Sequence, residues 1–393
     1  MPPKEIIPVS AVTTGSKKIK TIMIVAGEAS GDMHGAALVR EMSKINPSLH
    51  FYGIGGSQLE KMGVNLLVNN SSMAVMGIIE IVSKLRSILK ILGMMKKSLD
   101  EDRPDLLILI DYADFNLRLA KAAKKKGIKV FYYISPKVWA WRKSRIDQIK
   151  KFVDTMAVIF PFEVDTYATK GYTVHYVGHP LVDMVQPHYA KQDSRKKIGI
   201  AEDKTTIALL PGSRLSEVTK LLPEMLIAAE ILTEKIPDVQ FVLPLADTLE
   251  EKIIFDISKS SSVKIKVIAG KTYDVIASAD LAIVASGTAT LETGLLCVPM
   301  IIIYKLSPIS VLIARMIINP QHIGLVNIIA GKTIVPELIQ SDANGPRIAS
   351  EALAILLNEE KKQEMIAQLS DIRAKLGEPG AARRAAQIAC DMI

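Results

Sequence analysis

Short, strongly aliphatic segments alternate with helical stretches along almost the whole chain, and this alternation constrains the fold more than any other feature. Runs rich in valine and isoleucine are typical of strands buried on both faces, as in parallel sheets. The expected strands are Thr21–Ala26, His50–Ile54, Leu106–Asp111, Lys129–Ser135, Thr155–Ile159, Val174–Val177, Thr206–Leu210, Val239–Leu243, Lys264–Ile268, Leu281–Val284 and Met300–Tyr304. A repeated strand–helix–strand order predicts parallel sheets with helices on both faces.

The polar segment 186–205, which contains Pro187 and many charges, is expected to link two domains of similar size. We therefore predict an α/β protein with two doubly wound, Rossmann-like domains, at 18–185 and 206–345, that face an interdomain cleft. In such sheets ligands bind outside the carboxyl ends of the strands. A helical tail follows at 346–393. The sequence leaves open whether this tail packs on the second domain or returns to the first.

The cysteines and the apolar segments limit the class of protein. Cys297 and Cys390 lie far apart in no paired motif, so we expect a reducing compartment and no disulfide framework. The longest apolar stretch, 299–318, is broken by charges and a proline, so we expect no segment to span a bilayer. His175 and His179 stand four apart, but they flank Gly178 and precede Pro180 at a strand end, so we expect no metal there. The prediction is a cytoplasmic or peripheral protein without a cofactor.

Positive charge is concentrated in one part of the chain. Residues 84–151 hold 18 Lys and Arg against 7 Asp and Glu, whereas the net charge of the whole chain is +8. Such a zone favours a phosphate-bearing partner: nucleic acid, anionic lipid or a phosphorylated substrate. The aromatic and basic residues of 132–142 could stack on single-stranded nucleic acid, but no known nucleic-acid module surrounds them. We expect no nucleic-acid partner.

The stretch Val75–Met95 has the pattern of a basic amphipathic helix. Lysines and arginines flank an apolar face that comprises Ile78, Ile81, Val82, Leu85, Ile88, Leu89 and Leu92. An ordinary surface helix explains this pattern. Shallow docking in an anionic membrane explains it equally well, because the apolar arc is wide. The sequence alone leaves both interpretations open.

The first expected strand runs directly into a glycine-bearing turn, Gly27–Asp32, which opens a helix. Free backbone N–H groups and the helix dipole make such a turn suitable for an anion. Glu28, Ser30 and Asp32 are therefore candidate substrate-binding residues. The alternative is structural: Ser30 or Asp32 could simply cap the helix.

A second turn, Pro211–Arg214, follows the first strand of the second domain. Gly212 and Ser213 would let a ligand approach the backbone closely, and Arg214 could bind a phosphate through two parallel hydrogen bonds. The alternative is an exposed arginine in an ordinary loop.

A third turn, Ala285–Glu292, again joins a strand to a helix. Ser286 and Gly287 are small and leave room for a ligand, and the N–H groups of Gly287 and Thr288 could hold a diphosphate. Glu292 could accept hydrogen bonds from a ribose diol. A capping box formed by Thr288 and Glu292 is an imperfect alternative, because the glutamate comes one residue late.

The buried strand at 106–110 ends in Asp111, with Asp114 three residues later. A carboxylate at a strand end is a candidate general base. Asp114 is well placed to be the N-cap of the next helix, so we assign it a structural or supporting role. Asp111 has no such structural explanation, and we predict that it is the catalytic residue.

Taken together, these motifs resemble the lipid-A-disaccharide synthases, glycosyltransferases of Gram-negative outer-membrane biogenesis. The resemblance runs from about Lys20 through Gly27–Asp32, Ala74–Gly77, Ile110–Asn116, Ser135–Arg142, Phe160–Glu163, Gly178–Pro180, Leu209–Arg214, Ala285–Glu292 and a stretch that begins at Asn327. Ala113 and Val326 stand where the family usually has proline. Neither change removes a reactive group, so both concern local backbone shape.

The resemblance implies the GT-B fold and an inverting transfer. The expected donor is UDP-2,3-diacylglucosamine, and the acceptor is 2,3-diacylglucosamine 1-phosphate. Asp111 would be the base, Arg214 would stabilise the leaving group, and Asn327 would join Glu292 in binding donor. The enzyme would lie peripherally on the inner face of the inner membrane, and a homodimer is left open. Two rivals remain: a UDP-sugar epimerase of the same fold, and a non-catalytic membrane-bound UDP-sugar sensor.

Overall fold

The computed structural model describes residues 19–70, 78–138, 144–246, 248–305 and 322–393, with the backbone alone described for 78–85. Contacts divide the chain into two compact units. The first unit comprises the residues up to Pro136 together with 147–157 and 382–393. The second unit comprises 137–146 and 158–381.

The first sheet has seven strands in the order β3-β2-β1-β4-β5-β6-β7. Its strands are β1 (Lys20–Ala26), β2 (Leu49–Gly55), β3 (Asn65–Asn69), β4 (Leu106–Ile110), β5 (Lys129–Tyr133), β6 (Thr155–Val158) and β7 (His175–Tyr176). Every described register in this sheet is parallel. The strand order reverses direction at β1 and β4, which pair side by side.

The second sheet has six strands in the order β10-β9-β8-β11-β12-β13. Its strands are β8 (Thr205–Leu210), β9 (Val239–Leu245), β10 (Ile265–Ala269), β11 (Leu281–Ala285), β12 (Met300–Tyr304) and β13 (Glu337–Ile339). Its described registers are also parallel. Here β8 and β11 meet at the reversal of strand order.

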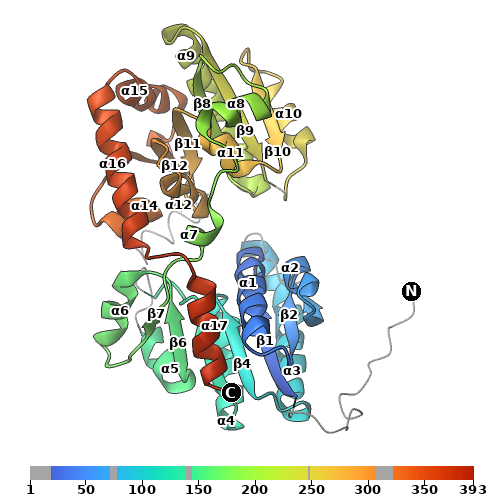
Figure 1. Cartoon of the computed structure of the whole chain (residues 1–393). Helices are drawn as coiled ribbons and strands as arrows, with labels where there is room; N and C mark the ends of the chain where they lie inside the picture. The colour runs from blue at the N-terminus through green and yellow to red at the C-terminus, as the bar shows by residue number, and fades with distance from the viewer. Residues whose placement is uncertain (1–18, 71–77, 139–143, 247, 306–321) are drawn as a thin grey trace. The chain divides into compact units, whose positions relative to one another are not determined.

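Helices join the strands in chain order (Figure 1). They are α1 (Ala29–Ile45), α2 (Ser57–Lys61), α3 (Ile78–Glu101), α4 (Ala113–Lys125), α5 (Arg145–Phe152), α6 (Pro161–Ala168), α7 (Leu181–Met184), α8 (Lys191–Ile198), α9 (Leu215–Lys235), α10 (Glu251–Ser258), α11 (Thr272–Ala277), α12 (Thr288–Leu295), α14 (Leu325–Ala330), α15 (Gly345–Leu356), α16 (Glu359–Lys375) and α17 (Ala381–Asp391), with a 3-10 turn, η2, at Gln340–Asp342. None of these described helices is both long and apolar enough to cross a membrane.

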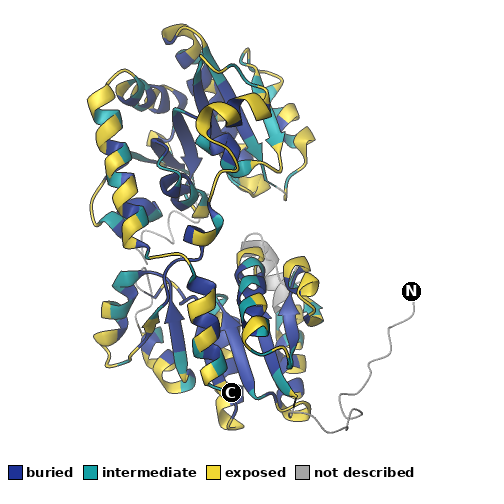
Figure 2. Ribbon diagram, viewed as in Figure 1, coloured by how far each residue is buried: buried dark blue, intermediate teal, exposed yellow. Residues whose placement is uncertain are grey.

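The strands form the core of each unit. All five residues of β4 and all five of β11 are buried. Figure 2 shows the central strands of both sheets in dark blue, whereas the helices carry yellow, exposed faces. Burial on both faces explains why these strands are continuous aliphatic runs rather than alternating ones.

The predicted alternation of strands and helices is confirmed, since each of the eleven expected strands is present within a few residues. Two further strands, β3 and β13, were not predicted. The side chains of β3 alternate between exposed and half-buried, and β13 has only three residues, so neither forms an aliphatic run.

The predicted linker contains a helix, and the predicted helical tail consists of α15, α16 and α17. Helix α8 falls inside the predicted linker and packs against α11. In the tail, α15 packs against α9, and α16 packs against α12 and α14. Nearly all of the last helix, α17, belongs instead to the first unit, where Lys129 Nζ donates to the carbonyl oxygen of Met392 at 2.6 Å.

One carboxylate ties α8 to the second sheet. Asp280, just before β11, accepts from Arg195 Nη2 at 2.8 Å, from Lys191 Nζ at 2.6 Å and from the Thr206 amide at 2.8 Å. Arg195 is itself buried, and it also donates to two backbone carbonyls. Burial alone would raise the pKa of Asp280, but these hydrogen bonds and the two positive charges outweigh it and lower the pKa.

We predict that Asp280→Ala lowers the free energy of unfolding by about 3 kcal/mol, because it leaves the buried Arg195 guanidinium unpaired. The depressed pKa of Asp280 means that its contribution is present near neutral pH and is lost as the pH falls through that pKa. Urea denaturation of parent and variant should therefore converge in acid. Asp238→Ala is the control, since its ion pair with Lys204 is exposed. Equal effects of the two changes at pH 7 would contradict this account.

Candidate active site

The carboxyl ends of β1 and β4 bring two of the predicted motifs together. Ala26 is the register partner of Ile110, so the turns that begin at Gly27 and Asp111 are neighbours. A Cβ added to Gly27 would lie 2.5 Å from the ring of Tyr112. Glycine is therefore needed at position 27 because an aromatic ring from the adjacent turn covers it.

The turn after β4 has an unusual backbone. Asp111 and Tyr112 are consecutive non-glycine residues with positive φ, 46° and 43°. Tyr112 is the N-cap residue of α4, which begins at Ala113. The expectation that Asp114 is the N-cap is wrong, because the helix begins before it; Asp114 lies exposed in the first turn.

The environment of Tyr112 disfavours ionisation of its hydroxyl. Burial raises the pKa of Tyr112, and the negative charges of Glu28 and Asp114 raise it further. Glu28 is exposed at the N-cap position of α1, where no side chain caps the helix, and Ser30 is exposed in the first turn. Three of the predicted substrate-binding residues, Glu28, Ser30 and Asp114, thus expose side chains at the carboxyl edge of the first sheet.

Asp32 has a different place from the one expected. It is buried, and its carboxylate accepts three backbone hydrogen bonds, from the amides of Gly56 at 2.7 Å, Gln58 at 2.9 Å and Leu59 at 3.1 Å. Asp32 therefore caps α2 rather than its own helix. Both of its oxygens are occupied, so its contribution to a site is to fix the loop after β2.

In the second unit, Arg214 occupies the N-cap position of α9, directly after β8. Its side chain is 63% exposed, and Nη1 lies 3.3 Å from Glu217 Oε1. Gly212 has a φ of 108°, and a Cβ there would meet the Glu217 carboxylate at 2.3 Å. Ser213 is exposed, and its carbonyl accepts from the Thr248 hydroxyl at 2.6 Å. Glycine at 212 thus leaves room for the Glu217 carboxylate, which pairs with Arg214.

The turn after β11 exposes the start of a helix. Gly287 is the N-cap residue of α12 in extended conformation, and no atom within 4 Å would meet a Cβ there. Thr288 is exposed beside it. Ser286 is half-buried, and its hydroxyl donates to the Ile323 carbonyl at 3.2 Å. The N-cap of α12 therefore has open space beside it, which an anion at this helix start would need.

Glu292 lies on the second turn of the same helix. Burial raises the pKa of its carboxyl group, and a hydrogen bond from the Tyr273 hydroxyl, at 3.2 Å, partly offsets that rise. Because Glu292 is half-buried rather than exposed, its position is fixed by packing and by Tyr273.

Asn327 is fully buried, and both ends of its amide are used. Nδ2 donates to the Val335 carbonyl at 2.9 Å and to Glu337 Oε1 at 2.7 Å, whereas Oδ1 accepts from the amides of Ile334 and Val335. Glu337 also accepts from the amides of Ile323 and Gly324 at the start of α14. Asn327 therefore holds neighbouring loops together, and Glu337 is a partner that the sequence did not indicate.

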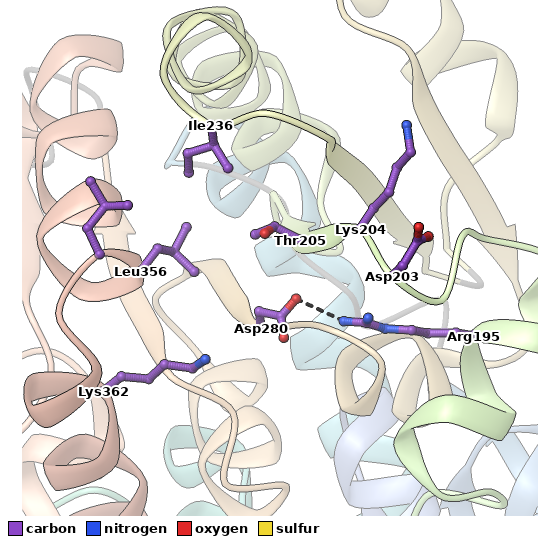
Figure 3. Close-up of a pocket in the computed structure, with 9 residues that line it drawn as sticks. Arg195, Asp203, Lys204, Thr205, Ile236, Asp280, Leu356 and Lys362 are labelled. Atoms are coloured by element: carbon purple, nitrogen blue, oxygen red, sulfur yellow. Dashed lines mark hydrogen bonds and ion pairs between the residues drawn. The ribbon is translucent and has the colours of Figure 1, made fainter.

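A separate cavity of about 250 Å³ lies at the amino ends of β8 and β11, the opposite edge of the second sheet (Figure 3). Asp280 and Arg195 line one side, and Leu356 and Lys362 line the other. The charges of this cavity largely neutralise one another, with Arg195 on Asp280, Lys204 on Asp238 and Lys362 near Glu359. We interpret it as a structural crevice.

Two predicted motifs lie wholly or partly outside the described residues: Ala74–Gly77, and the Trp139–Arg142 part of the aromatic and basic cluster. The side chains of Ile78, Ile81, Val82 and Leu85 lie outside them as well. In the described part of α3, Leu89 is exposed and Ile88 is half-buried. Leu92 is buried in the core of the first unit, which leaves it no surface to offer a membrane.

Comparison with known proteins identifies the family of this chain. A family model described as lipid-A-disaccharide synthetase matches residues 22–392. The lipid-A-disaccharide synthase of Syntrophus aciditrophicus is 56% identical over 375 residues, which cover 95% of this chain and 98% of the relative. That of Geobacter sulfurreducens is 45% identical, covering 95% and 97%. The chain belongs to the lipid-A-disaccharide synthase family. The predicted resemblance is therefore confirmed.

Similar solved structures show the fold class and no particular activity. The UDP-GlcNAc 2-epimerase of Neisseria meningitidis aligns with a TM-score of 0.64 at 13% identity, covering 94% of this chain and 98% of that one. MurG of Acinetobacter baumannii aligns with a TM-score of 0.60 at 14% identity, covering 95% and 100%. The predicted GT-B class of α/β fold is confirmed. At this identity, the likeness to an epimerase does not favour epimerase activity.

Proposed function

We propose that this protein is an inverting glycosyltransferase that condenses UDP-2,3-diacylglucosamine with 2,3-diacylglucosamine 1-phosphate. The products are the β(1→6) disaccharide 1-phosphate and UDP. Family membership over residues 22–392 carries the proposal. The arrangement of acidic groups at one sheet edge, and of an arginine and a helix start at another, supports it.

On the acceptor side, Asp111 is the general base. Its carboxylate takes the proton from the acceptor 6-hydroxyl as that oxygen attacks C1 of the donor sugar. The C1–O bond to the diphosphate breaks at the same time, and the bonding electrons leave with UDP. Glu28, Ser30 and Asp114 contact the acceptor, because their exposed side chains lie at the same edge as Asp111.

On the donor side, Arg214 and the amides of Gly287 and Thr288 stabilise the negative charge that develops on the diphosphate. Arg214 pairs with Glu217, and the two amides belong to the start of α12, which fixes their place in the backbone. Glu292 binds the ribose diol. Gly212, Ser213 and Ser286 border the nucleotide, and Asn327 supports this region through the buried network with Glu337.

We further propose that the protein is peripheral on the inner face of the inner membrane, since both substrates carry acyl chains. Exposed Leu89 and Met94 of α3 provide apolar contacts. A groove of about 620 Å³ between α4 and α5 carries a small excess of positive charge. Its basic residues are Arg118, Lys121 and Lys151, and its acidic ones are Asp114 and Asp147. Helix α3 packs beside α4, so these features share one region of the first unit.

The direct test is to incubate the purified protein with both acylated substrates and to follow the products by mass spectrometry. We expect the disaccharide 1-phosphate and free UDP in equal amounts. An epimerase would change the donor without consuming the acceptor, and a sensor would release no UDP. Either of those results would overturn the proposed function.

We predict that Arg214→Ala lowers kcat/KM by roughly 100-fold or more, because it removes a charged stabiliser of the leaving group. Arg214→Lys should recover only part of this loss, since lysine lacks the planar fork that binds two phosphate oxygens. The control is Arg347→Ala, an exposed arginine of α15. An unchanged kcat/KM for Arg214→Ala would remove the residue from the mechanism.

UDP binding should weaken as the pH falls. Only the ionised Glu292 accepts two ribose hydroxyls, and burial has raised its pKa above the ordinary 4.5. Tyr273→Phe removes the hydrogen bond that offsets this rise, so the loss of affinity should move to higher pH. Glu292→Gln should weaken binding roughly 10- to 100-fold and flatten the pH dependence. Calorimetric titration of UDP checks this, with Glu234→Gln, a change of an exposed glutamate of α9, as the control. A pH profile of Glu292→Gln that matches the parent would be contrary evidence.

Binding to vesicles that contain anionic phospholipid tests the membrane contact. The double change Arg118→Glu with Lys121→Glu should weaken sedimentation with such vesicles at least tenfold, because two attractive charges become repulsive. Leu89→Ser with Met94→Ser should weaken binding also at high salt, where charge is screened. Lys252→Glu with Lys264→Glu, exposed lysines of the second unit, is the matched control. Binding that matches the parent in both test variants would rule out this surface.

A further inference from the structure

We propose that Asn116 and Tyr132 are positioning residues for the transfer reaction. They hold the peptide that joins Asp111 to Tyr112 and so fix the direction of the Asp111 side chain. This inference rests on the proposed function, in which Asp111 is the base. It extends that proposal to two buried residues that touch no substrate.

Both residues bond to the backbone of the turn. Asn116 Nδ2 donates to the carbonyl of Asp111 at 2.7 Å and to that of Ile110 at 3.2 Å. The Tyr132 hydroxyl donates to the same Asp111 carbonyl. Both side chains are fully buried, on α4 and β5, the elements that follow β4 in the chain. One carbonyl oxygen is therefore held from two rigid elements.

The held peptide needs such support, because its conformation is strained. Two consecutive non-glycine residues in the left-handed region are each unfavourable, and they persist only where surrounding structure imposes them. The Tyr112 ring is fixed from its other side by Gly27, which has no Cβ to displace it. Relaxation of the turn would rotate the Asp111 side chain away from its present direction.

The bonding of Asn116 argues against a role in packing alone. Its Oδ1 is buried and has no hydrogen-bond partner among the described residues. Its amide orientation is nonetheless defined, since Nδ2 faces two carbonyl oxygens. A residue kept only to fill space would avoid an unsatisfied buried acceptor, as leucine would. Asparagine here is explained by the two carbonyls that it holds.

Steady-state kinetics of conservative variants tests the proposal. Tyr132→Phe removes one hydroxyl and should lower kcat roughly 3- to 30-fold, with the KM of both substrates within about twofold, because the base is misdirected while binding is retained. Asn116→Leu should lower kcat further, by roughly 100-fold. Tyr133→Phe is the matched control: its side chain points to the opposite face of the same strand, and it should leave kcat within about twofold.

Gly27→Ala tests the same turn from its other side. The added methyl group displaces the Tyr112 ring, so this variant should also lose kcat rather than affinity. Gly93→Ala is its control, because a Cβ at position 93 meets no atom within 4 Å. Hydrogen exchange of the segment 106–118, followed by mass spectrometry, gives a readout independent of activity and should be faster in Tyr132→Phe, Asn116→Leu and Gly27→Ala than in the parent.

The outcomes separate this inference from the proposed function. Exchange that is unchanged in all three variants overturns the positioning role, whatever their activity. Faster exchange with an unchanged kcat also overturns the positioning role. In that case a loss of activity in Asp111→Asn would still support Asp111 as the base. If Asp111→Asn retains activity but the three variants lose kcat, the base assignment fails and the positioning of this turn stands.

Discussion

Parallel pairing of the strands is the constraint on which the rest of the structure depends. Because β1 and β4 run in the same direction and in register, the turns after them must emerge at one edge of the sheet. The same holds for β8 and β11 in the second unit. Groups that are far apart in sequence, such as Glu28 and Asp114, become neighbours without any contact designed for them alone.

The turns at these sheet edges differ in whether glycine occupies the position with unusual backbone or space requirements. At Gly212 and Gly287 the absence of a side chain leaves space, for the Glu217 carboxylate in one case and for solvent or ligand in the other. At Asp111 the chain keeps two non-glycine residues in a conformation that glycine would adopt easily. Glycine would relieve the strain but remove the carboxylate. If Asp111 is the base, as we propose, the function requires a carboxylate at this point despite the strain.

The sequence predicted the fold class and the strands well, because burial on both faces leaves a continuous aliphatic signature. It failed where that signature is absent, as in β3, whose side chains alternate between exposed and half-buried. The sequence predicted the turns of the candidate site, but not whether each side chain there is exposed or already hydrogen-bonded within the protein. Asp32, predicted from its turn, and Asn327, implied by the family resemblance, were both expected to bind substrate, yet backbone amides outside their own helices occupy their side-chain oxygens. Such pairings, and the burial of Leu92, depend on tertiary contacts that a local pattern does not contain.

The central claim is that Asp111 is the general base of the transfer, whereas the second unit binds the nucleotide. Measuring UDP affinity and kcat side by side in Asp111→Asn tests it most directly. The account predicts a Kd for UDP within about twofold of the parent and a kcat lower by roughly 100-fold or more, because a carboxamide cannot take the proton. A kcat within a few-fold of the parent, or a parallel loss of UDP affinity, would contradict it.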